Sequence, residues 1–414
     1  MRHFHEPALM PSPQNSATAE TVPPASEGLP LRILIPFAGA GRTLYGLERA
    51  TMDLFDFLRP RVLPHFLLSH AALRHDTLAL REVRRRGFAY SFLSDTTPWP
   101  VITKPRSPAQ AWKLGMALLK WNRDVLRMAV RCDALYVNGI RCAYSAAVAC
   151  IYCRMAGKRV IYQFHDLIPY RSRALWFLRF VVRDFIHNTE AGYRLVSKIN
   201  PFILRCNNHV IPYVIQPSEG RGREGAVDAL ARGKRAIVFV GQVSLHKGVD
   251  LLLQAFALLD DYPDVMLLIA GGCAPEFAPV LDSMLRDARL AGRVVHLDYQ
   301  EDVLPLLSGA YLYVHPTPPS RFLEAFGRSA LEAMACGVPA VCFPAGAIGE
   351  VVVHGETGLV CDRENAECLA ENLRRFLDDR QFRDRCGARS RERFLTVYAS
   401  QHVAAGWGRL LEER

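Results

Sequence analysis

The sequence lacks a long apolar run. Half of its 414 residues are hydrophobic, yet no uninterrupted apolar stretch reaches the roughly 18 residues that indicate a membrane-spanning helix. No membrane span is therefore predicted. Residues 1–30 also lack the pattern of a signal peptide, because they are polar and rich in Pro, Ser and Ala. We expect them to form a disordered tail.

The eleven cysteines do not follow the spacing of a disulfide framework. They are scattered through apolar segments, which is typical of a protein in the reducing cytoplasm. Cys150 and Cys153 form a CxxC pair, but it lies in an apolar helical pattern with no second pair and no His cluster. We expect these two cysteines in the hydrophobic core and not at a zinc ion.

The positive charge is not spread uniformly. The chain has a net charge of +10, but residues 1–218 carry +15 and residues 219–414 carry −5. A chain that binds nucleic acid through its whole surface would be basic throughout, so no nucleic-acid partner is predicted. The asymmetry fits a surface that approaches an anionic lipid or another anionic acceptor.

Strand and helix patterns alternate along the chain, and the same order begins twice. Leu31–Phe37 reads as a buried strand followed by the loop Gly39–Ala40–Gly41 and a helix. Ala236–Val240 reads as a second such strand, followed by a glycine-containing loop and a helix. Strand, glycine loop and helix open a doubly wound domain, with ligand expected at the carboxyl ends of the strands. The patterns also predict a strand over Val210–Val214 and helices over Ala143–Ala156 and Ala366–Phe394.

The length requires more than one hydrophobic core. We therefore predict an α/β protein of two Rossmann-like, doubly wound domains that face each other across a cleft. The first domain covers 31–218, a linker covers 219–234, and the second domain covers 235–396. A last helix, 397–414, is long enough to return to the first domain.

Two carboxylates lie eight residues apart around Phe326–Gly327. If the segment were helical throughout, Glu324 and Glu332 would be about 12 Å apart along the axis. Gly327 precedes the helical run Arg328–Ala335, where free backbone N–H groups favour phosphate. Two Glu on an Ala- and Leu-rich helix also suit a solvated face, but the small residues around them suggest close ligand approach. The pattern favours a pocket for a nucleotide sugar.

Two further segments offer groups that such a ligand needs. In Phe239–Gly248, Gly241 ends a strand and frees backbone N–H groups, and Lys247 offers a cation for a diphosphate. Taken alone, Lys247 is more typical of a surface residue in a strand-to-helix loop, and the functional interpretation depends on its combination with Glu324 and Glu332. His165 ends a buried strand at the predicted cleft, where a purely structural histidine is also common.

Other patterns exclude or weaken competing functions. The loop with Gly39 and Gly41 lacks the third glycine and the later acidic residue of a dinucleotide site, so NAD binding is not expected. No D-x-D pair ends a strand, so metal-dependent diphosphate binding is not expected. The basic, aromatic helix Arg171–Arg183 suits an anionic membrane surface, and equally suits a helix packed on its own domain.

The residues from Glu324 to Asp362 resemble the E-x7-E signature of retaining glycosyltransferases, most closely family 4 with the GT-B fold. The segment FVGQVSLHKG is similar to another motif of this family. There, Gln242 stands where the family usually has Arg, so a charged phosphate contact is replaced by a neutral one. Arg321 is a neighbour that could share this contact.

The resemblance implies a role for each residue. Glu332 would hold the ribose, Lys247 with Gly241 and Gln242 the diphosphate, and Glu324 with Phe326 and Gly327 the transferred sugar. His165 would hydrogen-bond the sugar, and the loop with Gly39 and Gly41 would form the acceptor side. The catalytic residues implied are His165, Glu324 and Lys247, without a metal or a cofactor, since the nucleotide sugar is itself a substrate.

The function implied is transfer of a hexose, with retention, from a nucleotide sugar to a lipid-linked or saccharide acceptor. Such a protein would act in cell-surface polysaccharide or glycolipid biosynthesis, in the cytoplasm at the inner face of the membrane. Two alternatives remain open. One is a non-catalytic protein that binds sugar nucleotides, and the other is a sugar-nucleotide epimerase with the GT-B fold.

Overall fold

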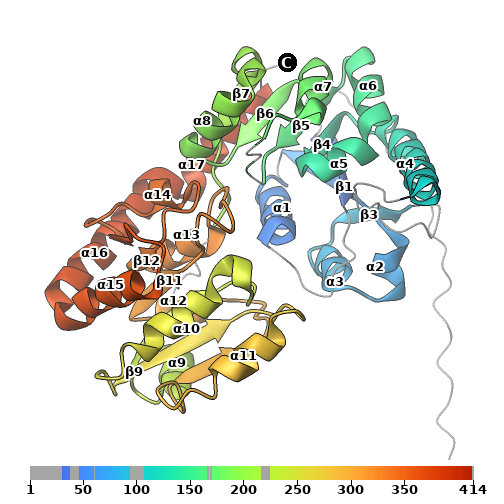
Figure 1. Cartoon of the computed structure of the whole chain (residues 1–414). Helices are drawn as coiled ribbons and strands as arrows, with labels where there is room; N and C mark the ends of the chain where they lie inside the picture. Colours follow the sequence, from blue (N-terminus) through green and yellow to red (C-terminus); the bar gives the residue numbers. More distant parts are fainter. Residues whose placement is uncertain are drawn as a thin grey trace, which may run out of the picture.

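A computed structural model describes residues 30–37, 46–59, 61–93, 107–165, 167, 170–215 and 224–412. It contains two parallel β-sheets, each covered by helices (Figure 1). The predicted tail, apart from Pro30, and the loop with Gly39 and Gly41 lie outside the described residues. Within the described part, no helix is long and apolar enough to cross a membrane.

The N-terminal sheet has the strand order β3-β2-β1-β4-β5-β6-β7. The chain moves outward from β1 to β3 and then crosses to β4, so the order reverses between β1 and β4, where doubly wound domains bind ligands. The strands are β1 (Leu31–Phe37), β2 (Val62–Leu68), β3 (Ala89–Phe92), β4 (Ala134–Asn138), β5 (Arg159–Gln163), β6 (Asp184–His187) and β7 (Asn207–Val210). The helices are α1 (Gly46–Phe57), α2 (His70–Arg74), α3 (Leu78–Arg85), α4 (Pro108–Ala129), α5 (Gly139–Ser145), α6 (Ala147–Met155), α7 (Arg173–Val181), α8 (Glu190–Ile199) and the 3-10 turn η1 (Pro201–Arg205).

The C-terminal sheet repeats this logic with the order β10-β9-β8-β11-β12-β13. Its strands are β8 (Arg235–Val240), β9 (Val265–Ala270), β10 (Val294–Leu297), β11 (Leu312–His315), β12 (Ala340–Cys342) and β13 (Gly358–Val360). Its helices are α9 (Glu224–Ala231), η2 (Leu245–Lys247), α10 (Val249–Ala257), α11 (Ala278–Met284), α12 (Leu304–Ser308), α13 (Arg328–Ala335), α14 (Ile348–Val351), α15 (Ala366–Asp378) and α16 (Arg380–Arg393), followed by η3 (Phe394–Tyr398) and α17 (Ser400–Glu412).

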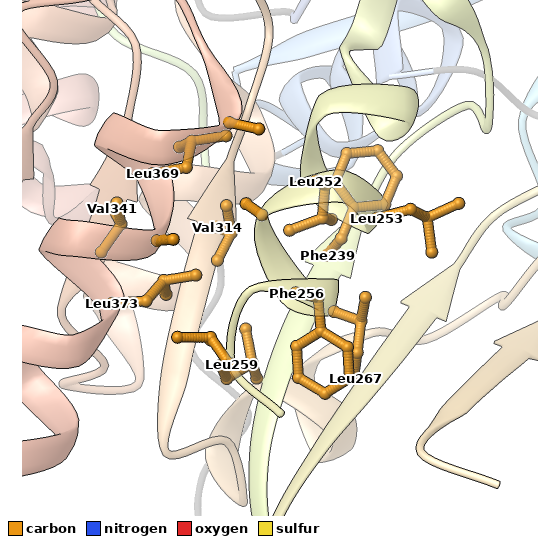
Figure 2. Close-up of a cluster of buried hydrophobic side chains, with 14 of the residues drawn as sticks. Phe239, Leu252, Leu253, Phe256, Leu259, Leu267, Val314, Val341, Leu369 and Leu373 are labelled. Carbon is orange, nitrogen blue, oxygen red and sulfur yellow. The ribbon is translucent and has the colours of Figure 1, made fainter. Parts of the chain in front are cut away.

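The core of the C-terminal domain lies on both faces of its sheet. Figure 2 shows one face, where Leu252 and Phe256 of α10 and Leu369 of α15 pack against strand residues such as Phe239 and Leu267. On the other face, α9, α12 and α13 pack against the alternate residues of the same strands. Burial on both faces explains why these strands are continuous apolar runs.

The last helix returns to the N-terminal domain, as predicted. Val403, Trp407 and Leu410 of α17 belong to the same buried cluster as Ile33 and Ile35 of β1. Figure 1 shows α17, in red, among the green elements of the N-terminal domain. The fold is therefore two facing Rossmann-like domains joined by the chain and by this helix.

The structure differs from the sequence-based prediction in five respects. Part of the predicted linker 219–234 is helix α9, because Val227 has a core position to fill. The strand predicted over Val210–Val214 ends at Val210, and β6 and α8 were not predicted. The helix predicted over Ala143–Ala156 is interrupted at Ala146. The one over Ala366–Phe394 is interrupted at Asp379, whose side chain accepts a hydrogen bond from the Phe382 N–H and so begins α16.

Candidate functional site

A cavity of about 400 Å³ lies between the two domains, at the carboxyl ends of the central strands. From the N-terminal domain it is lined by the start of α1, by His165 and by Tyr213. Every predicted site residue that the structure describes lines it: His165, Gly241, Gln242, Lys247, Glu324, Phe326, Gly327 and Glu332. The structure thus brings together residues that are up to 167 positions apart in the sequence.

Gly248 positions Lys247, and any other residue in place of this glycine would be strained. Gly248 follows it with φ of +71° and begins α10. A Cβ at this position would lie 1.9 Å from the Pro316 carbonyl oxygen. The close approach holds the turn η2 against the loop after β11, so the Lys247 side chain reaches the cavity. The alternative of a fully solvated surface lysine does not hold, because its side chain is 20% exposed.

Lys247 and Glu324 form an ion pair inside the cavity. The Lys247 Nζ lies 2.5 Å from the Glu324 Oε1. The same oxygen lies 3.2 Å from the Nε2 of His315 and accepts a hydrogen bond of 3.2 Å from the Thr317 hydroxyl. Burial alone would raise the pKa of Glu324, but His315 and Lys247 outweigh it and hold this pKa well below its usual value. Glu324 is thus a carboxylate at neutral pH, not a proton donor.

Glu332 is held by an arginine that sequence reasoning missed. The Arg328 Nε donates a hydrogen bond of 2.9 Å to the Glu332 Oε1, across one turn of α13. The Arg328 Nη2 lies 2.5 Å from the Oδ2 of Asp53 in α1. Asp53 also pairs with Arg86, at 2.8 Å. Arg328 therefore connects the predicted ribose-binding carboxylate to the N-terminal domain.

Both carboxylates are buried, so the alternative of a solvated helix face is wrong. Glu324 is 8% exposed and Glu332 is 4% exposed. The predicted helical run Arg328–Ala335 is confirmed as α13, and Glu324 lies in the preceding loop, so the 12 Å spacing of a continuous helix does not apply. Gly327 ends this loop with φ of +79°, and a Cβ there would lie 2.5 Å from the Ile348 Cδ1. This left-handed backbone conformation favours glycine at the start of α13, and any side chain there would be strained.

His165 lies on the opposite wall of the cavity. Its Nδ1 is 2.8 Å from the Tyr213 hydroxyl and its Nε2 is 3.4 Å from the Tyr136 hydroxyl. Burial lowers the pKa of His165 to about 3, so its imidazole is neutral. The ring of Tyr213 packs edge-on against Phe326 at 4.9 Å, which joins the two walls. A neutral imidazole in this position can exchange hydrogen bonds with a ligand hydroxyl.

The suggested contribution of Arg321 to phosphate binding is not supported. Its Nη1 lies 2.7 Å and 2.9 Å from the two carboxylate oxygens of Asp250, and Arg321 does not line the cavity. Gln242 does line it, and Arg49 of α1 lines it from the other domain. Sequence reasoning missed Arg49 because nothing in its local pattern distinguishes it from a solvated helix residue.

Comparison with known proteins gives the context of this cavity. Residues 224–393 match the family model described as glycosyl transferases group 1. The chain is 29% identical over 176 residues to N-acetyl-alpha-D-glucosaminyl L-malate synthase of Bacillus anthracis. The aligned residues make up 42% of this chain and 45% of that protein. It is 32% identical over 159 residues to O-antigen chain mannosyltransferase B of Escherichia coli, covering 37% and 39%. The chain thus spans less than half the length of these relatives.

The structural similarity extends over nearly the whole chain. Alr3699/HepE of Anabaena, solved in complex with UDP and glucose, superposes with a TM-score of 0.74 over 93% of this chain and 100% of that one, at 17% identity. Identity this low shows the fold alone. The chain therefore has the GT-B fold, and its C-terminal domain is similar in sequence to the glycosyl transferases group 1.

Proposed function

We propose that the protein is a glycosyltransferase that moves a hexose, with retention, from a nucleotide sugar to a lipid-linked or saccharide acceptor. The observation that carries the proposal is the shared cavity, where Lys247, Glu324 and Glu332 meet at the strand ends between two domains. The matching family and the relatives named above support glycosyl transfer. Several relatives are named for lipopolysaccharide, O-antigen or capsule synthesis, which supports a role in cell-surface polysaccharide or glycolipid synthesis.

Each group has a role in the proposed reaction. Lys247 neutralises the diphosphate of the leaving group, and Arg49 adds positive charge from the other wall. Glu324 accepts hydrogen bonds from the hydroxyls of the transferred hexose, and Glu332 from those of the ribose. His165, held neutral by burial, hydrogen-bonds the same hexose.

The proposed chemistry needs no protein nucleophile. The acceptor hydroxyl attacks the hexose on the same face from which the phosphate departs, and the departing phosphate takes the proton of that hydroxyl. The acceptor binds to the N-terminal domain, and closure of the two domains excludes water that would hydrolyse the donor. Independence from a metal is part of the proposal, with Lys247 and the start of α13 meeting the negative charge.

A second candidate is a protein that binds sugar nucleotides without catalysis. Gln242 favours it, because a neutral side chain replaces a cation beside the diphosphate. The ion pairs also favour it, because both predicted hydroxyl-binding carboxylates already have cationic partners. An epimerase is less well supported, since it needs a proton donor in the cavity and the pKa of Glu324 is held too low for that role.

We also propose that the protein works at the cytoplasmic face of the membrane. In α7, Trp176 and Phe180 are 51% and 53% exposed, whereas Val181 is buried. The helix therefore packs on its own domain and presents aromatic side chains to the outside as well. Both sequence-based interpretations of this segment apply to different sides of the same helix.

Nucleotide release tests the proposal. The purified chain is incubated with UDP-, GDP- and ADP-sugars and a membrane extract as the source of acceptor. We expect release of one nucleotide, and we expect Lys247→Ala and Glu332→Ala to abolish it while the thermal unfolding midpoint stays within a few degrees. A wild-type protein that binds nucleotide but releases none would refute transfer and support the non-catalytic candidate.

A further inference from the structure

A second pocket lies on the N-terminal domain, away from the cavity between the domains. It has a volume of about 360 Å³. It is lined by residues of α6, α7, η1 and the segments that enter β6 and β7: Arg154, Arg179, Phe180, Val182, Arg183, Arg205, Cys206 and Asn207. These residues lie at the amino ends of the strands, whereas His165 and the cavity lie at the carboxyl ends.

The lining of this pocket is strongly cationic. Among the residues that the structure describes, the lining contains four arginines and no carboxylate. Asp184, which follows the lining residue Arg183 in the sequence, is fully buried. Its carboxylate lies 3.2 Å from the Arg159 Nε and 3.1 Å from the His209 Nε2, and it accepts a hydrogen bond of 2.6 Å from the Asn207 amide. Three of these arginines, Arg154, Arg179 and Arg205, bring guanidinium groups to one hollow, where they repel each other. A bound anion relieves that repulsion, and phosphate matches the paired N–H groups of arginine.

Arg179 is held rigidly at the pocket. Its guanidinium carbon lies 5.0 Å from the centre of the Trp176 ring, 4.4 Å from that of Phe180 and 5.8 Å from that of Phe202. Its Nε is buried and has no hydrogen-bond partner. A cation already packed among three rings loses less conformational freedom on binding an anion than a fully solvated arginine does.

Phe180, which lines the pocket, and Met155 and Leu204, which are sequence neighbours of lining arginines, are exposed apolar residues, and we call these three the apolar rim. Met155 is 83% exposed, Phe180 is 53% exposed and Leu204 is 61% exposed. Each of them is the sequence neighbour of an arginine that lines the pocket. Large apolar side chains beside a cationic pocket are unfavourable when they are exposed to water, and a soluble phosphate in the pocket would not cover them. The boundary between headgroups and acyl chains of a membrane covers both parts at once.

We propose that this pocket binds the phosphate of an anionic phospholipid, while the apolar rim enters the bilayer at the depth of the headgroups. The proposal gives a location to the membrane contact proposed above. It does not depend on the transfer reaction, because lipid binding is measured without donor or acceptor.

Co-sedimentation with vesicles tests it on the full chain. We expect the wild-type protein to bind vesicles of phosphatidylcholine with phosphatidylglycerol, and not vesicles of phosphatidylcholine alone. A basic residue at an anionic surface contributes about fivefold in affinity, so Arg154→Gln with Arg205→Gln should weaken binding about 25-fold. Both side chains are exposed, so the unfolding midpoint should not change. The matched control, Arg286→Gln with Arg380→Gln, removes the same charge from the C-terminal domain and should bind as the wild type does.

Two further variants separate the pocket from general electrostatic attraction. Arg154→Lys with Arg205→Lys keeps the charge but loses the fork geometry, so it should bind more weakly than the wild type. Met155→Ser with Leu204→Ser should weaken vesicle binding and leave binding of soluble glycerol phosphate unchanged. If the lysine variants bound vesicles as well as the wild type does, the proposed binding of phosphate in this pocket would be overturned.

Other outcomes would assign the pocket to a different ligand. Binding of glycerol phosphate without binding of vesicles would overturn the lipid and indicate a soluble phosphate compound. Self-association of the wild type that the two Arg→Gln changes abolish would indicate a second copy of the chain. Equal losses in the matched control would show that only net charge matters, which would also overturn the proposal.

Discussion

Glu324→Gln should have opposite effects on the two halves of the proposed donor. We expect it to tighten the binding of the nucleoside diphosphate and to stop transfer of the sugar. The reason is the ion pair, in which Glu324 holds the Lys247 ammonium at 2.5 Å. A diphosphate must draw this ammonium away from the carboxylate, and it must also approach the negative charge of Glu324. The glutamine variant removes both obstacles.

The magnitude follows from the geometry of the pair. Two unit charges about 4 Å apart attract each other by about 4 kcal/mol at the effective dielectric constant of a partly buried site, and this pair, at 2.5 Å, attracts at least as strongly. Most of this is offset, because Lys247 is 20% exposed and regains water when it leaves the carboxylate. We expect about 1.4 kcal/mol to remain, which is about tenfold in the dissociation constant of the nucleoside diphosphate.

Titration calorimetry measures the first effect, and nucleotide release from the matching nucleotide sugar measures the second. Loss of the contact to the hexose should lower kcat by about 100-fold or more, because a misplaced sugar no longer presents its reacting carbon to the acceptor. Thr317 and His315 can still bond the amide, so the unfolding midpoint should stay close to that of the wild type.

Lys247→Met is the matched control for this experiment. It removes the same ion pair from its other end, and it should weaken diphosphate binding where Glu324→Gln strengthens it. If both variants weakened binding equally, the ion pair would only support the fold of the loop. If Lys247→Met left binding unchanged, Lys247 would not contact the diphosphate, and the reasoning would be refuted.

Three other predictions concern His165, which lines the cavity, and two residues that support residues of its lining. Asp53→Asn should weaken donor binding about tenfold. The reason is that Arg328 then pairs more fully with Glu332 and the ion pair between the two domains is lost. Titration calorimetry measures this effect, with Asp56→Asn as the control. His165 has its pKa lowered to about 3, so the unfolded chain takes up its proton first and stability falls as the pH drops below about 6.5. At pH 5 this histidine should cost about 2 kcal/mol relative to pH 8, and urea unfolding of His165→Gln should lack that loss. Gly248→Ala should lower the unfolding midpoint by several degrees, because its Cβ would meet the Pro316 carbonyl oxygen; an unchanged midpoint in a thermal melt would contradict the argument.

The strands and the layout of the domains could be predicted because their signals are local. Val265–Ala270 is a continuous apolar run between Asp264 and Gly271, and the structure gives β9 the same bounds. The run is apolar because helices cover both faces of the sheet, so the pattern and its cause coincide. The same holds for β1, which opens the first domain.

The partners of the site residues could not be predicted because they come from distant parts of the chain. Arg328 bonds Asp53, which lies 275 positions earlier. Each residue alone is typical of a charged helix surface, and only the packing of α1 against α13 makes them a pair. Helix α9 was missed for a related reason: its short sequence has turn-forming neighbours, and Val227 gains its burial from strands that come later in the chain.

The two proposals together restrict the acceptor. The phosphate pocket and the cavity lie at opposite ends of the same parallel strands; β5 begins at Arg159 near one end, and His165 follows two residues after β5 ends at the other. Six residues of extended chain span about 20 Å. A bilayer held at the pocket therefore leaves the cavity about that distance away along the strands. A lipid whose reacting hydroxyl lies directly at its headgroup would not reach, whereas a lipid-linked saccharide of several sugar units would. The geometry thus favours the extension of an existing glycan over the first glycosylation of a lipid.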